Sequence, residues 1–189
     1  MQMAESKNNI VTHGLSGKVG DLLVFSQRNG KTIVSKAPKD RTGELSDKQK
    51  AHKLKFQKAV LYAKAVLNDP IKRQLYEAKS DNSIGMSTYN VAVADLLNAP
   101  DIEEINLSGY TGNIGDIIKI VATDDFGVVS VNVKIENADG SLVEQGAAVN
   151  NGAEWIYTAA ASNPDLAGDK ITVTASDAPA NLTEETKIL

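Results

Sequence analysis

The chain of 189 residues contains no cysteine, one tryptophan and only two histidines, His13 and His52. Without cysteine it can form no disulfide, thiolate metal site or cysteine nucleophile. Neither histidine lies in a His-Glu-x-x-His or triad-like grouping, and the sequence contains no Gly-x-Ser-x-Gly motif. We therefore expect both histidines to be solvated or at the edge of a core. We expect a protein that is not an enzyme and needs no cofactor.

Long apolar runs are also missing. No stretch approaches the roughly 18 consecutive apolar residues that a membrane-spanning helix needs. Residues 1–20 contain no apolar segment typical of a secretory signal. The sequence therefore predicts no membrane insertion, and a cytoplasmic location is only the default expectation for an otherwise unknown compartment.

Charge is distributed unequally along the chain. Residues 1–100 hold sixteen lysines and arginines against nine acidic residues, a net charge of +7. Residues 101–189 hold four lysines and fifteen acidic residues, a net charge of −11. This asymmetry predicts two units with different surfaces. It also favours attraction between the halves, either within one chain or between chains, or contact of the basic half with an anionic partner.

The N-terminal half is predicted to combine a β-hairpin with helices. Residues 1–13 show no pattern, so we expect a flexible leader. The segment 21–36 is predicted to form a hairpin around Asn29-Gly30, because a primed turn needs positive φ. Ser46 and Gln49 have capping-box spacing, which predicts a helix from Ser46 to about Asn68. Two shorter helices are expected over 71–79 and 86–97, which completes a unit spanning 14–99.

The long predicted helix carries two apolar stripes. One contains Phe56, Ala59, Val60, Ala63 and Leu67, and the other contains Leu54, Leu61 and Ala65. A helix with two such stripes makes contacts on two sides. A small unit offers few surfaces to cover both stripes, so this pattern indicates self-association.

The C-terminal half, residues 101–189, has the period-two pattern of β-strands. The clearest part is 116–140, which we predict to be a hairpin with its turn at 124–127. Further strands are expected at 105–107, 142–149, 154–160, 170–175 and 183–189. Short strands at roughly ten-residue spacing are typical of a β-sandwich. The predicted fold class is therefore α+β, with two domains.

The C-terminal segment resembles bacterial immunoglobulin-like accessory domains. The residues that carry this likeness are Gly115-Asp116, Val131–Ile135, Asp139-Gly140, Trp155, Tyr157 and the run from Thr174 to Asn181. The resemblance implies a sandwich used for presentation and contact. It does not extend to antibody-type recognition, because there is no cysteine pair and Trp155 falls on a late strand.

The N-terminal half resembles a family of uncharacterised bacterial proteins. The shared features are Gly14, Gly17, Gly20, Gly30-Lys31 and the helix start Ser46–Gln49. That family has no known activity to transfer to this chain.

Three sets of residues are candidate binding sites. Basic side chains could contact phosphates of nucleic acid or an acidic glycan: Lys36, Lys39, Arg41, Lys48, Lys50, Lys53, Lys55 and Lys58. Loop oxygens could bind calcium: Asp124, Asp125, Asp139, Asp177 and Asn181. Trp155 and Tyr157 share one strand face, where they pack in the core or stack on a sugar.

The preferred hypothesis is a non-enzymatic structural or protein-binding module that can self-associate. Its partner would be another protein or a second copy of the chain. An anion-binding module that uses the basic half is the first alternative. Carbohydrate adhesion through the sandwich is the second alternative.

Overall fold

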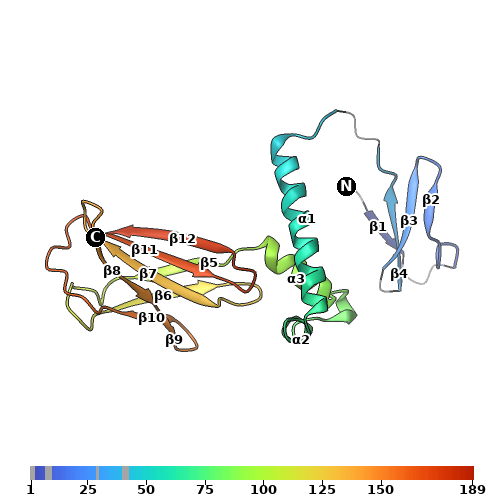
Figure 1. The fold of residues 1–189 in the computed structure, drawn as a ribbon. Coiled ribbons are helices and arrows are strands. Elements are labelled where there is room, and N and C mark those ends of the chain that lie inside the picture. Colours follow the sequence, from blue (N-terminus) through green and yellow to red (C-terminus); the bar gives the residue numbers. More distant parts are fainter. Residues whose placement is uncertain (1–2, 7–9, 29, 40–42) are drawn as a thin grey trace.

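The computed structural model describes residues 3–6, 10–28, 30–39 and 43–189 (Figure 1). Within these residues the chain has three α-helices, one short 3₁₀ helix and three four-stranded antiparallel sheets. The fold is therefore α+β with a high β content, as the sequence predicts. Figure 1 shows the helices between an N-terminal sheet and a C-terminal pair of sheets.

The N-terminal sheet has the strand order β1-β4-β3-β2. Its strands are β1 (Met3–Ser6), β2 (Gly17–Val19), β3 (Leu23–Arg28) and β4 (Lys31–Lys36). The hairpin β3–β4 turns at Gly30, whose φ is +72°; Asn29 lies outside the described residues. The segment predicted as a flexible leader contains β1, which pairs with β4. Among the described side chains before residue 46, only Thr32 and Ala37 are buried, so this sheet has little core of its own.

The helices form a second, separate layer. They are α1 (Asp47–Asn68), α2 (Pro70–Glu77), the 3₁₀ helix η1 (Asn82–Ile84) and α3 (Thr88–Leu97). The predicted capping box starts α1: the Gln49 backbone N–H donates to Ser46 Oγ at 3.3 Å, and the Ser46 N–H donates to Gln49 Oε1 at 3.1 Å. The helices bury a small core of Ala63, Val66, Tyr76 and Ala92.

The C-terminal half forms a two-sheet unit over residues 101–189. One sheet has the order β5-β6-β10-β9 and the other has the order β12-β11-β7-β8. Every strand predicted here is present within a few residues of its expected position. The strands are β5 (Asp101–Asn106), β6 (Ile117–Thr123), β7 (Ser130–Glu136), β8 (Leu142–Ala147), β9 (Val149–Asn150), β10 (Trp155–Thr158), β11 (Lys170–Ser176) and β12 (Leu182–Ile188).

The two sheets share one hydrophobic core. It includes Ile118 and Ile120 from β6, and Val131, Val133 and Ile135 from β7. The alternation read from the sequence therefore identifies the buried faces of both strands. The predicted pairing of these strands is wrong, because β6 pairs with β5 and β10, whereas β7 pairs with β11 and β8. The segment from Asp124 to Val129 crosses between the sheets, which lets both apolar faces cover the same core.

Candidate functional site

The helices meet the two-sheet unit at a contact region that we call the junction. Two loops of the two-sheet unit take part: 124–129 between β6 and β7, and 177–181 between β11 and β12. The Phe126 ring stacks on Tyr76 with 4.2 Å between ring centroids. Lys79 Nζ lies 4.7 Å from the centroid of the Phe126 ring and donates a hydrogen bond to the Phe126 carbonyl. These contacts combine aromatic packing with a cation–π interaction.

Asn181 adds hydrogen bonds to the junction. Its Nδ2 lies within hydrogen-bond distance of three carbonyl oxygens at the end of α3: Asp95 at 3.1 Å, Leu96 at 3.3 Å and Asn98 at 2.8 Å. These carbonyls have no following helical turn to donate to them. The 177–181 loop therefore satisfies the C-terminus of α3.

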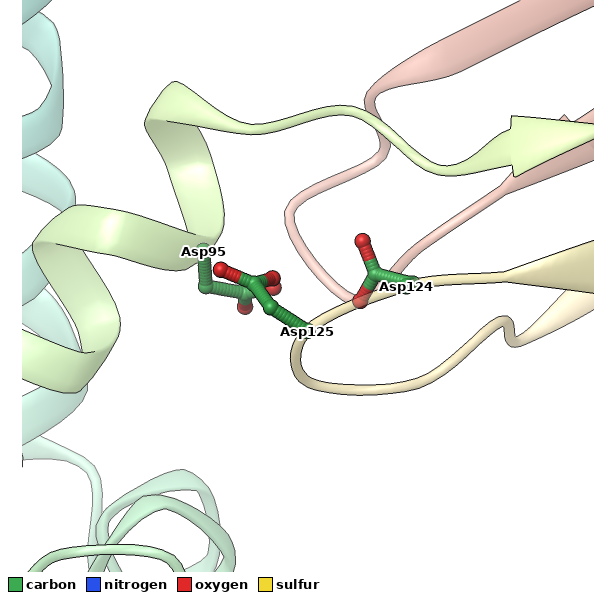
Figure 2. Close-up of side chains that lie close together, drawn as sticks. All are labelled: Asp95, Asp124 and Asp125. Carbon is green, nitrogen blue, oxygen red and sulfur yellow. The ribbon is translucent and has the colours of Figure 1, made fainter.

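Three carboxylates from the two sides of the junction come together. Asp95 is on α3, whereas Asp124 and Asp125 are on the loop after β6. One oxygen from each lies within 4.8 Å of the others. Figure 2 shows the carboxylates of Asp95 and Asp125 pointing toward one another, with Asp124 beside them on the loop. We call these three residues the carboxylate cluster.

Asp95 is the most buried member of the cluster, with 1% of its surface exposed. Its Oδ2 accepts a hydrogen bond from the Tyr76 hydroxyl. Because that hydroxyl has a single hydrogen, the Tyr62 hydroxyl, 2.7 Å away, donates to Tyr76. The second oxygen, Asp95 Oδ1, is buried and has no hydrogen-bond partner within the described chain.

The other two carboxylates are also held by one oxygen. Asp124 Oδ2 accepts from the backbone N–H groups of Phe126 at 2.9 Å and Gly127 at 2.6 Å. Asp124 Oδ1 is buried without a partner among the described residues. Asp125 is exposed, and its Oδ2 accepts from Asn98 Nδ2 at 2.8 Å. Each cluster member thus has one anchored oxygen and one available oxygen.

The electrostatics of the cluster are unfavourable for Asp95. Burial raises its pKa to about 6, and repulsion from Asp177, Asp124 and Asp125 adds to this, while the Tyr76 hydrogen bond opposes it. Burial also raises the pKa of Asp177. In the described part of the chain, the salt bridges involve none of these carboxylates.

A cleft of about 460 Å³ adjoins the cluster. Asp95 and Asp125 line it, together with apolar side chains that include Val91, Ala94 and Phe126. Arg28, from the β3–β4 turn, and Lys79 also line it. The cleft therefore gives solvent and small ions a path to two of the three carboxylates.

The structure brings together part of the predicted calcium set. Asp124 and Asp125 are in the cluster, and the loop that carries Asp177 and Asn181 is adjacent to it. Both Asp177 oxygens, however, accept hydrogen bonds from Asn181, at 2.6 and 2.7 Å. Asp139 lies at the opposite end of the two-sheet unit, in the β7–β8 turn.

Asp95 was not among the site residues predicted from the sequence. A single aspartate on a helix is usually solvated, and nothing in its immediate sequence marks a ligand. One signal was present: Asp95 is three residues after Ala92, so the two share the buried face of α3. An acidic residue on an apolar face needs a hydrogen-bond partner, and the structure supplies the Tyr76 hydroxyl of α2.

The predicted basic set is not gathered on one surface. Arg41 lies outside the described residues, and Lys36 and Lys39 precede α1 in exposed positions. The five lysines of the predicted set that lie on α1 are exposed. At 3.6 residues per turn, however, they lie on different sides of the helix. Lys50 pairs with Asp47 at 3.6 Å, and Lys55 Nζ donates to the Leu97 carbonyl at 2.8 Å. Anion binding remains a prediction.

The aromatic pair of β10 lies in the core. Trp155 and Tyr157 are both buried between the two sheets, as the core interpretation predicts, so they offer no stacking surface to a sugar. His13 and His52 are exposed, as expected for solvated histidines. None of the described helices combines the length and the apolar character needed to cross a membrane.

Comparisons of the chain with protein-family models, curated proteins and solved structures give no significant match.

Proposed function

We propose that the chain is a non-enzymatic structural module that associates head to tail, with α1 of one copy contacting the two-sheet unit of the next. The observation that carries this proposal is an apolar face of α1 that the described residues leave exposed. Leu54 and Leu61, on that face, are 54% and 66% exposed. The opposite side of the helix buries Ala59, Ala63 and Val66.

Charge favours a head-to-tail contact over the pairing of two α1 helices. Helix α1 carries six lysines and a single acidic residue, Asp47. Two such helices repel each other, whereas the C-terminal half, with a net charge of −11, attracts them. A contact between two different surfaces repeats from copy to copy, so it builds chains unless the geometry closes a ring.

The solvent-facing side chains of β12 are suited to contact α1 of another copy. Leu182 and Ile188 are 62% and 74% exposed, and the exposed Glu184 lies between them. On α1, Lys58 lies between Leu54 and Leu61 on the same face. Both surfaces thus place a charge between two apolar side chains, with opposite signs. Strand β12 is also an edge strand, which has backbone groups free for a partner.

We also propose that the two-sheet unit is an immunoglobulin-like sandwich. Its support is the pair of four-stranded antiparallel sheets around one core, together with the sequence resemblance of residues 101–189. This fold leaves strand faces and edges available for contact, which suits an assembly module. Fold alone does not specify function, so the assembly proposal rests on the exposed surfaces.

The double substitution Leu54→Lys with Leu61→Lys tests the α1 surface. Wild-type protein is expected to show a molar mass that rises with concentration in light scattering coupled to size-exclusion chromatography. The variant is expected to remain monomeric. Burying the exposed parts of the two leucines contributes on the order of 2 kcal/mol, so the substitution weakens association by at least roughly thirtyfold.

A matched control changes two similarly exposed residues on α2, Ile71→Lys with Leu75→Lys. This variant gains the same charge in the same helical layer and is expected to associate like wild type. A strictly monomeric wild type, or equal loss of association in both variants, contradicts the assignment of the contact to α1.

A further inference from the structure

We propose that the junction binds a calcium ion through one oxygen from each of Asp95, Asp124 and Asp125. The site joins α3 to the loop after β6, so it belongs to neither unit alone. This inference is independent of the proposed self-association, because it uses different residues and a different surface.

The decisive observation is the unpartnered oxygen of Asp95. A carboxylate oxygen buried without a partner is costly, and native proteins rarely leave one so. Asp95 is 1% exposed, yet its Oδ1 has no hydrogen-bond donor within the described chain. Figure 2 shows the Asp95 carboxylate directed at that of Asp125. Asp124 Oδ1, on the facing loop, is a second buried oxygen in the same state. A cation among the three carboxylates gives these buried groups the positive partner that they lack.

The number of carboxylates favours calcium over magnesium, and their spacing is compatible with calcium. Ca²⁺–oxygen distances are about 2.3–2.6 Å, so two ligands of one ion can be about 5 Å apart. The three oxygens lie within 4.8 Å of one another, inside that limit. Mg²⁺ binds oxygen at about 2.0–2.1 Å in near-octahedral geometry and keeps several waters, so it is usually bound by one or two carboxylates rather than three.

The surroundings complete the requirements for a cation site. The anchored oxygens are oriented by the Tyr76 hydroxyl, two backbone N–H groups and the Asn98 amide. Such outer donors fix the direction of a ligand and tune its strength. The adjoining cleft, lined by Asp95 and Asp125, provides a path for the ion and space for water ligands.

Binding here ties the two units together. Asp95 is fixed in the helical core, and Asp124 and Asp125 move with the sheets. The connection between them through the backbone is short, from Asn98 to the buried Pro100. The ion adds a second, electrostatic link and removes the repulsion among three carboxylates. Calcium should therefore restrict the relative motion of the helices and sheets.

The test measures Ca²⁺ binding by full-length protein that has been freed of metal with a chelator. Isothermal titration calorimetry with CaCl₂ is expected to give one site per chain, with a dissociation constant on the order of 10⁻⁴ M or tighter. The variant Asp95→Asn is expected to weaken binding by more than about tenfold. Asparagine keeps an acceptor for Tyr76 and removes the buried charge, so this variant should fold.

A second readout locates the ion. Tb³⁺, which takes Ca²⁺ sites, is expected to show luminescence sensitised by Tyr76, whose hydroxyl contacts Asp95. The signal is expected to fall on addition of CaCl₂ and to be lost in Asp95→Asn and in Asp125→Asn.

The control is Asp139→Asn, which changes an acidic turn residue at the far end of the two-sheet unit. It is expected to bind Ca²⁺ like wild type. The absence of Ca²⁺ binding at millimolar concentration overturns the proposal, as does binding that Asp95→Asn leaves unchanged. A loss of binding in Asp139→Asn instead would also overturn it, because the ion would then be at the wrong end.

Discussion

Asp95 carries a carboxyl group in surroundings that disfavour its charge. It is buried in the helical core, and Asp124, Asp125 and Asp177 add negative charge from the facing loops. Tyr76 and Tyr62 are also nearby, and burial raises the pKa of both, while Arg28 and Lys79 line the same cleft as Asp95. The Tyr76 hydroxyl donates to one oxygen of Asp95 and only partly offsets this environment.

This environment predicts a pH-dependent stability for the metal-free chain. Asp95 has a pKa raised to about 6 in the fold, whereas an unfolded aspartate titrates near 4. Between these values the folded chain holds a proton that the unfolded chain has lost. Stability is therefore expected to fall as pH rises from about 4 through 6, by up to about 3 kcal/mol from this residue. Urea unfolding in chelator across this range measures the effect.

Asp95→Asn should remove that decline and make the metal-free chain more stable at neutral pH. Asp139→Asn provides the opposite sign, because hydrogen bonds from Ser141 lower the pKa of Asp139. The native Asp139 carboxylate therefore stabilises the fold at neutral pH, and this contribution is lost only in acid. An unchanged pH profile in Asp95→Asn would contradict the account of this residue.

At the scale of elements, local patterns predicted the helices and most strands, but the pairing only of β3 with β4. The capping box at Ser46 defined the start of α1, and alternation in β6 and β7 identified their buried residues. The alternation of apolar and polar residues shows which face of a strand is buried. It does not show which other strand pairs with it. The two strands were predicted to pair because they are adjacent in sequence, yet each belongs to a different sheet.

The same limit explains why the junction was predicted only in part. The loop acids Asp124 and Asp125 were candidates because of their residue type and position. Asp95 requires knowledge of how α3 packs against a loop almost 30 residues later, which no local pattern contains. Site residues that are neighbours in the sequence could therefore be predicted, whereas a site assembled from both units could not.

The packing of two loops against each other makes a separate prediction. Gly112 has φ of +87°, and a Cβ at this position would lie 2.0 Å from the Asn163 carbonyl oxygen. Gly112→Ala is therefore expected to destabilise the chain by more than about 3 kcal/mol, through both strain and collision. Gly152 also has positive φ, +99°, but open space around it.

Gly152→Ala is thus a matched control that measures backbone strain alone. It is expected to cost about 1–2 kcal/mol. The difference between the two variants in chemical denaturation isolates the loop–loop contact. Equal losses would show that the 107–116 and 159–169 segments are less closely packed than described.

At the scale of the molecule, the distribution of charge and of exposed apolar surface favours head-to-tail contact between copies. The N-terminal sheet and α1 are basic and leave apolar side chains exposed, whereas the two-sheet unit is acidic and well packed. Figure 1 places the N-terminal sheet and the two-sheet unit at opposite ends of the molecule, with α1 between them. Surfaces of unlike charge favour repeated contact between copies over a symmetric dimer.

The most direct measurement mixes two variants that are each blocked at one end. One carries Leu54→Lys with Leu61→Lys on α1, and the other carries Leu182→Lys with Ile188→Lys on β12. Each is expected to be monomeric alone by light scattering, because a head-to-tail contact needs both surfaces. The mixture should form a one-to-one pair and nothing larger, since only one intact α1 surface and one intact β12 surface remain. Association of the β12 variant alone, or no association in the mixture, would contradict head-to-tail assembly.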